Sequence, residues 1–123
     1  MKITINNKEI DNIISMKSIF QLTKGLMFKK SGRALLVFPL NAKHSIWMAC
    51  MKYSLDLIFI DENYKIVDIF EDVKPLTLNP KTWKTYIPKQ KCRYVLEVES
   101  GLIKKYDLKT GILVKFNYIT AQK

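Results

Sequence analysis

Two carboxylates, Asp56 and Glu97, stand inside otherwise apolar segments of this 123-residue chain. Paired carboxylates can act as general acid and general base when they face one cleft and their pKa values are separated. The neighbouring residues also allow a structural interpretation. Asp56 would accept backbone hydrogen bonds at a strand start, and the alternation along residues 93–99 would turn Glu97 toward solvent. We favour the structural roles, and an enzyme that uses both carboxylates is kept as an alternative.

A metal site is the second chemistry to weigh. His44, the only histidine, would share a strand face with Met48 and Cys50, and these soft ligands suit copper(I). Methionine and cysteine in strands are more often core residues, however, and one histidine with the distant pair Cys50 and Cys92 makes a zinc site weaker still. We therefore expect no metal, no cofactor and two reduced thiols, with a bridge between the two cysteines as the alternative.

Three aromatic side chains, Trp47, Trp83 and Tyr86, are candidates for a ligand-binding surface, because sugars and bases stack on exposed rings. Trp47 is expected to anchor the core, whereas Trp83 and Tyr86 lie in a segment with three prolines and several lysines. The sequence favours a non-enzymatic binding or accessory module for a small molecule or a protein partner. Its site would be a cleft near Trp47, Asp56 and Glu97, or the segment that holds Trp83 and Tyr86.

The net charge of +10 raises the possibility of a polyanion partner. No acidic residue lies between Lys74 and Glu97, and the basic residues proposed to contact a polyanion there are Lys81, Lys84, Lys89, Lys91 and Arg93. Only two residues of the chain are arginine, although arginine is the usual reader of phosphates and bases. A weak, lysine-driven nucleic-acid binder is therefore the first alternative to the binding module.

Several function classes lack their signatures. The chain has no glycine-rich phosphate loop, no Gly-x-Ser-x-Gly elbow and no His-Glu-x-x-His motif. No apolar run approaches the roughly 18 residues that cross a membrane, and the N-terminus lacks the apolar region of a signal peptide. We expect a soluble, cytoplasmic protein.

The elements that must position these residues follow from apolar periodicity. It predicts strands at residues 2–5, 9–14, 34–38, 44–51, 53–60, 64–70, 93–99 and 112–116. Apolar residues at helical spacing predict a helix over residues 16–27, and a second short helix is expected at residues 101–106. We expect a mainly β single domain over residues 1–123: a β-sandwich or small barrel with two short helices, an irregular loop at 74–91 and a frayed tail at 119–123.

A series of short motifs runs through most of the chain. They are Gly25-Leu26-Met27-Phe28, Leu35-Leu36-Val37-Phe38-Pro39, Trp47-Met48, Leu55-Asp56-Leu57-Ile58-Phe59-Ile60-Asp61, Val67-Asp68, Val73, Pro75, Tyr94-Val95-Leu96-Glu97-Val98, Gly101 and Leu108-Lys109-Thr110-Gly111. In order and spacing, from about residue 18 to residue 116, they resemble the domain of unknown function 192 (DUF192) family. No single motif is diagnostic, so the resemblance depends on the whole series.

The resemblance implies a compact β-sandwich-like domain and no established activity. Many relatives look exported, with a leader peptide. The family typically has a basic residue and an asparagine after the Trp-Met pair, whereas this chain has Ala49 and Cys50. A polar site built from that pair in relatives would be altered here.

Overall fold

The structure is a computed structural model that describes residues 1–16, 32–44, 46–47, 53–74 and 85–117. Strands account for most of the described chain, with one short helix, which confirms the predicted mainly β fold. The elements are β1 (Lys2–Ile5), β2 (Lys8–Ile10), β3 (Ile13–Met16), β4 (Arg33–Ala42), β5 (Ile46–Trp47), β6 (Leu55–Ile60), β7 (Ile66–Val73), β8 (Thr85–Tyr86), β9 (Cys92–Glu99), α2 (Leu102–Lys105) and β10 (Val114–Asn117).

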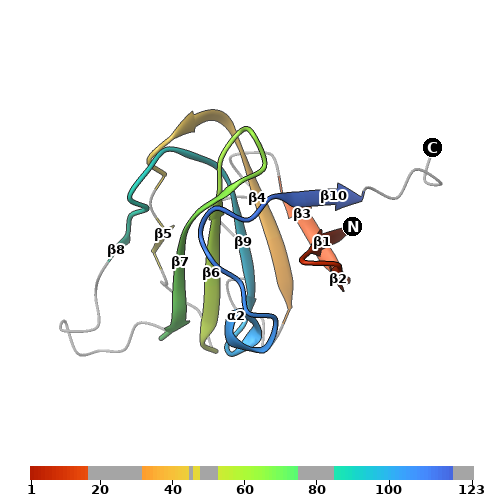
Figure 1. The fold of residues 1–123 in the computed structure, drawn as a ribbon. Coiled ribbons are helices and arrows are strands. Elements are labelled where there is room, and N and C mark those ends of the chain that lie inside the picture. The colour runs from red at the N-terminus through yellow and green to blue at the C-terminus, as the bar shows by residue number, and fades with distance from the viewer. Residues whose placement is uncertain (17–31, 45, 48–52, 75–84, 118–123) are drawn as a thin grey trace.

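A five-stranded sheet in the order β3-β4-β9-β6-β7 forms the centre of the fold (Figure 1). Only β3 and β4 are parallel, and the other neighbours are antiparallel. All six residues of β6 are buried, as expected for an almost continuous apolar run with neighbours on both faces. The strands predicted at residues 53–60 and 64–70 form β6 and β7, which pair as an antiparallel hairpin, and Asp61 Oδ1 closes its turn by accepting the N–H groups of Asn63 and Lys65.

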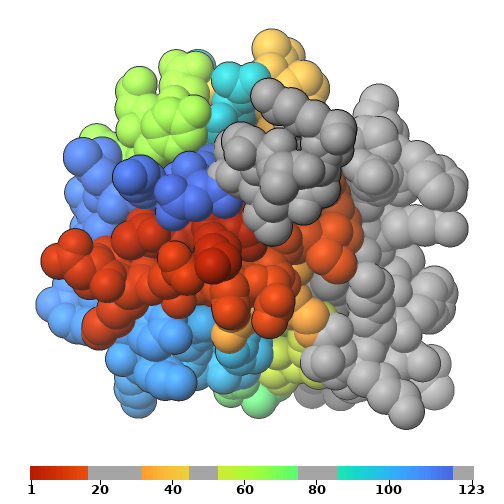
Figure 2. Space-filling view, turned by 90° about the vertical axis from the view of Figure 1, so that its right-hand side faces the viewer, coloured from red at the N-terminus to blue at the C-terminus, as the bar shows by residue number. Residues whose placement is uncertain are grey.

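A three-stranded sheet, β10-β1-β2, and helix α2 cover one face of the five-stranded sheet. Figure 2 shows the N-terminal residues (red) between the C-terminal strand (dark blue) and the region of α2 (light blue). Within the described ranges neither sheet closes into a barrel, so of the two predicted architectures the sandwich-like one applies. The first core, between these layers, contains Ile3, Ile5, Ile10, Ile13, Leu35, Ile58, Ile60, Ile66, Tyr94, Leu96, Val98, Leu102, Ile103, Leu108 and Val114.

The opposite face of the five-stranded sheet carries a second core. Its buried residues are Met16, Ala34, Leu36, Leu55, Leu57, Phe59, Val67, Val73, Cys92 and Val95. A two-stranded ribbon, β5 with β8, lies beside β7 (left in Figure 1), and Tyr86 of β8 packs against this core.

Several predicted boundaries change in the structure. Residues 9–14 form the end of β2 and the start of β3, because Asn12 takes a left-handed conformation (φ 55°) that interrupts the strand. The predicted helix over residues 16–27 falls almost entirely outside the described residues, and Met16 ends strand β3. The second predicted helix is confirmed as α2. None of the described helices is long and apolar enough to cross a membrane.

Arg33 of β4 forms a forked ion pair with Glu99 of the neighbouring strand β9 and also contacts Asp11, which lies between β2 and β3. Its Nε and Nη2 atoms donate to the two carboxylate oxygens of Glu99 at 2.8 and 2.6 Å, and Nη1 contacts Asp11 Oδ1 at 3.2 Å. The hydrogen bonds from Arg33 hold the pKa of Glu99 below its usual range.

We expect Arg33→Lys to lower the free energy of unfolding by about 1 kcal/mol at pH 7, because lysine cannot form the fork and the pair is partly exposed. The pKa of Glu99 is lowered in the folded state, so this stabilisation is present above its unfolded pKa and is lost as the pH falls through the folded value. Urea unfolding at pH 7 and at pH 3 measures both effects. Lys74→Gln breaks the exposed pair with Asp72 and is the control that should change stability little; an equal loss at both pH values would contradict the assignment.

Candidate functional site

Asp56 is a fully buried carboxylate whose two oxygens accept three backbone hydrogen bonds. Oδ1 accepts the N–H of Asp72 at 2.8 Å, and Oδ2 accepts those of Gly101 at 3.1 Å and Ile103 at 2.9 Å. The carboxylate therefore attaches the end of β7 and the start of α2 to β6. This arrangement matches the structural interpretation of Asp56 as a backbone acceptor near a strand start.

The structure does not bring Asp56 and Glu97 to one cleft. Asp56 alternates with Leu55 and Leu57, so it lies on the same face of β6 as Ile58 and Ile60, which belong to the first core. Glu97 lies on the opposite face. Its register partners, Ala34 on β4 and Leu57 on β6, both belong to the second core.

The prediction that Glu97 meets solvent is wrong, because its exposure is 6%. Alternation assigned Glu97 to the correct side of β9, but that side is covered by the second core. A row of paired residues crosses the sheet at this level: Ala34, Glu97, Leu57 and Phe70. The Tyr86 ring meets Phe70 edge to face at 5.4 Å between centroids.

The spacing between neighbouring strands indicates how far the aromatic pair, Phe70 and Tyr86, lies from the carboxyl of Glu97. Glu97 and Phe70 are two strand spacings apart, roughly 10 Å between backbones. Glu97 is therefore a carboxyl on an apolar face with an aromatic pair at its far side. We call this surface, made of Ala34, Glu97, Leu57, Phe70 and Tyr86, the Glu97 face.

Burial dominates the electrostatics of the Glu97 face. It raises the pKa of Glu97 to about 7, and in the described chain no hydrogen bond to this carboxyl adds to or opposes the effect. Burial also raises the pKa of Tyr53 to about 12, followed by the charges of Glu97 and Glu99. A buried carboxyl with a pKa near neutrality can donate a hydrogen bond when protonated and accept one when ionised.

The ribbon of β5 and β8 joins two segments that were predicted to belong to alternative sites. Ile46 pairs with Tyr86, and Trp47 pairs with Thr85, so the backbones of Trp47 and Tyr86 lie in one small sheet. Tyr86 is half-buried against the second core. Other predicted site residues, namely Trp83, Lys81, Lys84, Met48 and Cys50, lie outside the described residues.

His44 is engaged by its own segment. Its ring stacks on Phe38 at 3.9 Å with an 8° interplanar angle, and Nε2 lies 2.7 Å from the carbonyl oxygen of Leu40. Cys92 is a buried free thiol whose pKa is raised by burial, an effect partly opposed by the backbone N–H of His44. No group of three potential metal ligands occurs within the ranges that the structure covers.

The described basic residues of the predicted polyanion surface differ in exposure and in their contacts with the rest of the protein. Lys89 and Lys91 are exposed, whereas Arg93 is half-buried. Arg93 Nε donates to the carbonyl of Phe38 at 3.2 Å, and its guanidinium lies 5.9 Å from the centroid of the Tyr94 ring. Arg93 is thus engaged by the fold, and the exposed charge of this segment comes from the lysines.

Sequence reasoning missed Asp68 as a positioning residue. Asp68 is buried on β7, and its Oδ2 accepts the backbone N–H of Lys89 at 2.9 Å while Oδ1 accepts that of Ile69. It therefore fixes the segment before β9 to the edge of the sheet. The signal was present in the sequence, since Asp68 interrupts the apolar run of β7 as Asp56 interrupts that of β6.

Comparisons with known proteins agree on the family and the fold. Residues 1–116 match the family DUF192, described as Uncharacterized ACR, COG1430, so the match begins before the residue 18 at which the resemblance starts. UPF0127 protein PH1112 of Pyrococcus horikoshii is 36% identical over 102 residues, which cover 80% of this chain and 82% of the relative.

Two crystal structures share the fold. A protein of unknown function from Novosphingobium aromaticivorans has a TM-score of 0.81 at 18% identity, covering 94% of this chain and 82% of its own. A putative transcription regulator from Sinorhizobium meliloti has a TM-score of 0.79 at 20% identity, covering 93% and 89%. The family match extends over nearly the whole described fold, and this chain belongs to the uncharacterised DUF192 family, whose members include the UPF0127 proteins.

Proposed function

We propose that this protein is a non-enzymatic binding module that holds a small ligand at the Glu97 face. The observation that carries the proposal is the burial of the Glu97 carboxyl on an apolar surface without a hydrogen-bond donor among the described residues. Buried polar groups in folded proteins are almost always hydrogen-bonded, and exceptions are concentrated at functional sites. A ligand would supply a partner that the described residues do not provide.

The surroundings define the class of ligand. Phe70 and Tyr86 are partly buried and offer aromatic surface, and Leu57 is buried beside Phe70, so the ligand should have an apolar body. Its polar group should hydrogen-bond a carboxyl, either as an acceptor to the protonated acid or as a donor to the ionised form. The proximity of the Trp47 backbone in β5 supports the idea that the predicted aromatic residues belong to the same site.

Native mass spectrometry of gently purified protein tests this proposal. We expect a bound mass on the wild type and on Glu62→Gln, in which an exposed glutamate receives the same substitution. Glu97→Gln should lose at least about tenfold in affinity, because the neutral amide has no negative charge for a ligand donor and places an N–H₂ group where the ionised carboxylate offers an acceptor. A bound mass that survives Glu97→Gln unchanged, or no bound mass on the wild type, would contradict the proposal.

The alternative functions differ in their support. Polyanion binding rests on the exposed Lys89 and Lys91, and it predicts an affinity that falls by about 0.7–0.9 log units per log unit of salt for each phosphate contacted. A two-carboxylate enzyme gains no support, since Asp56 and Glu97 lie on opposite faces of the sheet. We keep the cytoplasm as the proposed compartment, and the free buried thiol of Cys92 is compatible with it.

A further inference from the structure

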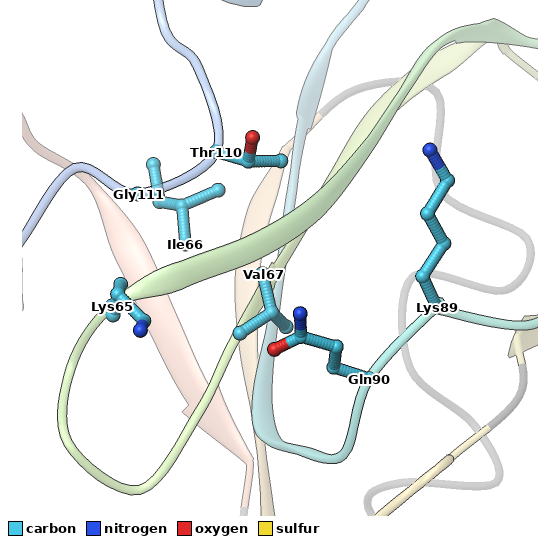
Figure 3. Close-up of a pocket in the computed structure, with 7 residues that line it drawn as sticks. All are labelled: Lys65, Ile66, Val67, Lys89, Gln90, Thr110 and Gly111. Carbon is cyan, nitrogen blue, oxygen red and sulfur yellow. The ribbon is translucent and has the colours of Figure 1, made fainter.

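A recess of about 330 Å³ opens where the first residues of β7 meet two other segments (Figure 3). One segment leads into β9, and the other is the turn before β10. The described residues that line it are Lys65, Ile66, Val67, Lys89, Gln90, Thr110 and Gly111. Its volume is at the lower end of the range for small-molecule sites, so the recess has room for a ligand larger than a single ion.

Backbone hydrogen bonds fix all three walls of the recess. The backbone N–H of Lys65 donates to Asp61 Oδ1, and the carbonyl of Lys65 accepts the backbone N–H of Asp61. The N–H of Lys89 is held by Asp68 Oδ2 at 2.9 Å, and that of Gly111 by the carbonyl of Ile66 at 2.7 Å. The recess is therefore preformed, and a ligand would not have to order these segments.

The polar groups around the recess are mostly hydrogen-bond donors. Lys65 and Lys89 supply two ammonium groups, and neither forms an ion pair with another described residue. Gln90 and Thr110 add an amide and a hydroxyl, and no carboxylate is found among the described lining residues. The nearby Asp68 already accepts two backbone N–H groups and does not line the recess.

We propose that this recess is a binding site for a small phosphate monoester. Such an ester has a charge of about −1.5 to −2 at pH 7, which matches two lysines, and its three oxygens can accept several donors at once. Lysine binds phosphate as a point charge and needs no forked geometry. Val67, on the opposite face of β7 from the fully buried Ile66, gives the organic part of the ester an apolar contact.

Amide chemical shifts in a titration with glycerol 3-phosphate test the site, with glycerol as the uncharged control. We expect saturable shifts confined to residues 65–67, 89–90 and 110–111. Lys65→Gln and Lys89→Gln should each weaken binding by about fivefold to tenfold, because each removes one charge-assisted contact. Lys104→Gln removes the same charge from α2, at the other end of the five-stranded sheet, and should leave the affinity unchanged (Figure 1).

Three results would overturn this site: no saturable shift with glycerol 3-phosphate, equal weakening by Lys104→Gln, or shifts spread over lysines outside the recess. A short oligonucleotide that binds while the ester does not would assign these lysines to nucleic acid. The substituted lysines are exposed, so the variants should fold, and a thermal unfolding midpoint verifies this. Glu97→Gln should leave the titration unchanged, so failure of the phosphate site is distinguishable from failure of the Glu97 proposal.

Discussion

Asp56→Ala is expected to lower the free energy of unfolding by about 3–5 kcal/mol. The change leaves the N–H groups of Asp72, Gly101 and Ile103 without their acceptor in or near the protein interior. Each unsatisfied buried donor costs about 1–3 kcal/mol, and the three losses are not fully additive because water can enter the vacated space. Urea unfolding at pH 7, followed by circular dichroism, measures the effect.

Two further variants make this test specific. Asp56→Asn keeps the size of the side chain but turns an amide N–H₂ toward one or two backbone N–H groups, so we expect a loss of about 2–3 kcal/mol. Asp107→Asn is the control, since Asp107 is exposed and asparagine tolerates its left-handed backbone conformation. A loss below about 1 kcal/mol for Asp56→Ala would mean that β7 and α2 are held without this carboxylate.

The sequence could predict that Asp56 accepts hydrogen bonds from the backbone, but not which residues donate them. A carboxylate within an almost continuous apolar strand must be satisfied by donors, and backbone N–H groups are the commonest ones. The donors that the structure shows lie 16, 45 and 47 residues away along the chain. Such contacts depend on how β7 and α2 pack against β6, and the local pattern contains no information about that packing.

Glu97 shows the corresponding limit for a strand. Period-two alternation correctly separated Glu97 from Leu96 and Val98 and predicted the side to which each side chain points. Alternation cannot predict what covers that side. The second face of β9 lies in the second core, against which Tyr53 and Tyr86 pack, and the pattern along β9 contains no sign of that packing.

The Glu97 face also could not be assembled from the sequence, for a topological reason. Glu97, Phe70 and Tyr86 come from three separate segments, which are brought together by the order of β9, β6 and β7 and by the packing of β8 on β7. The sequence identified Glu97 and Tyr86 as candidates for two different sites. Sheet order, which depends on long-range pairing, is what makes them parts of one surface.

Glu97→Gln is expected to make the protein more stable than the wild type above pH 7, and this advantage should disappear near pH 4. The folded pKa of Glu97 is raised to about 7 from an ordinary value of 4.5, so the folded state keeps a proton that the unfolded state has released between these pH values. The unfolded state then binds fewer protons, and stability falls as the pH rises through this window. The full effect above pH 7 amounts to about 3 kcal/mol.

Urea unfolding of the wild type, Glu97→Gln and the exposed control Glu62→Gln from pH 4 to pH 8.5 measures this difference. Any constant penalty for burying the glutamine amide shifts the Glu97→Gln curve equally at every pH, so the informative quantity is how the difference from the wild type changes with pH. Parallel curves would contradict the raised pKa, because they would show that the Glu97 carboxyl ionises in the folded protein at the same pH as in the unfolded chain. If instead Glu97→Gln gains stability at neutral pH and loses the bound mass, the wild type keeps a destabilising carboxyl that its ligand requires, as functional residues often do.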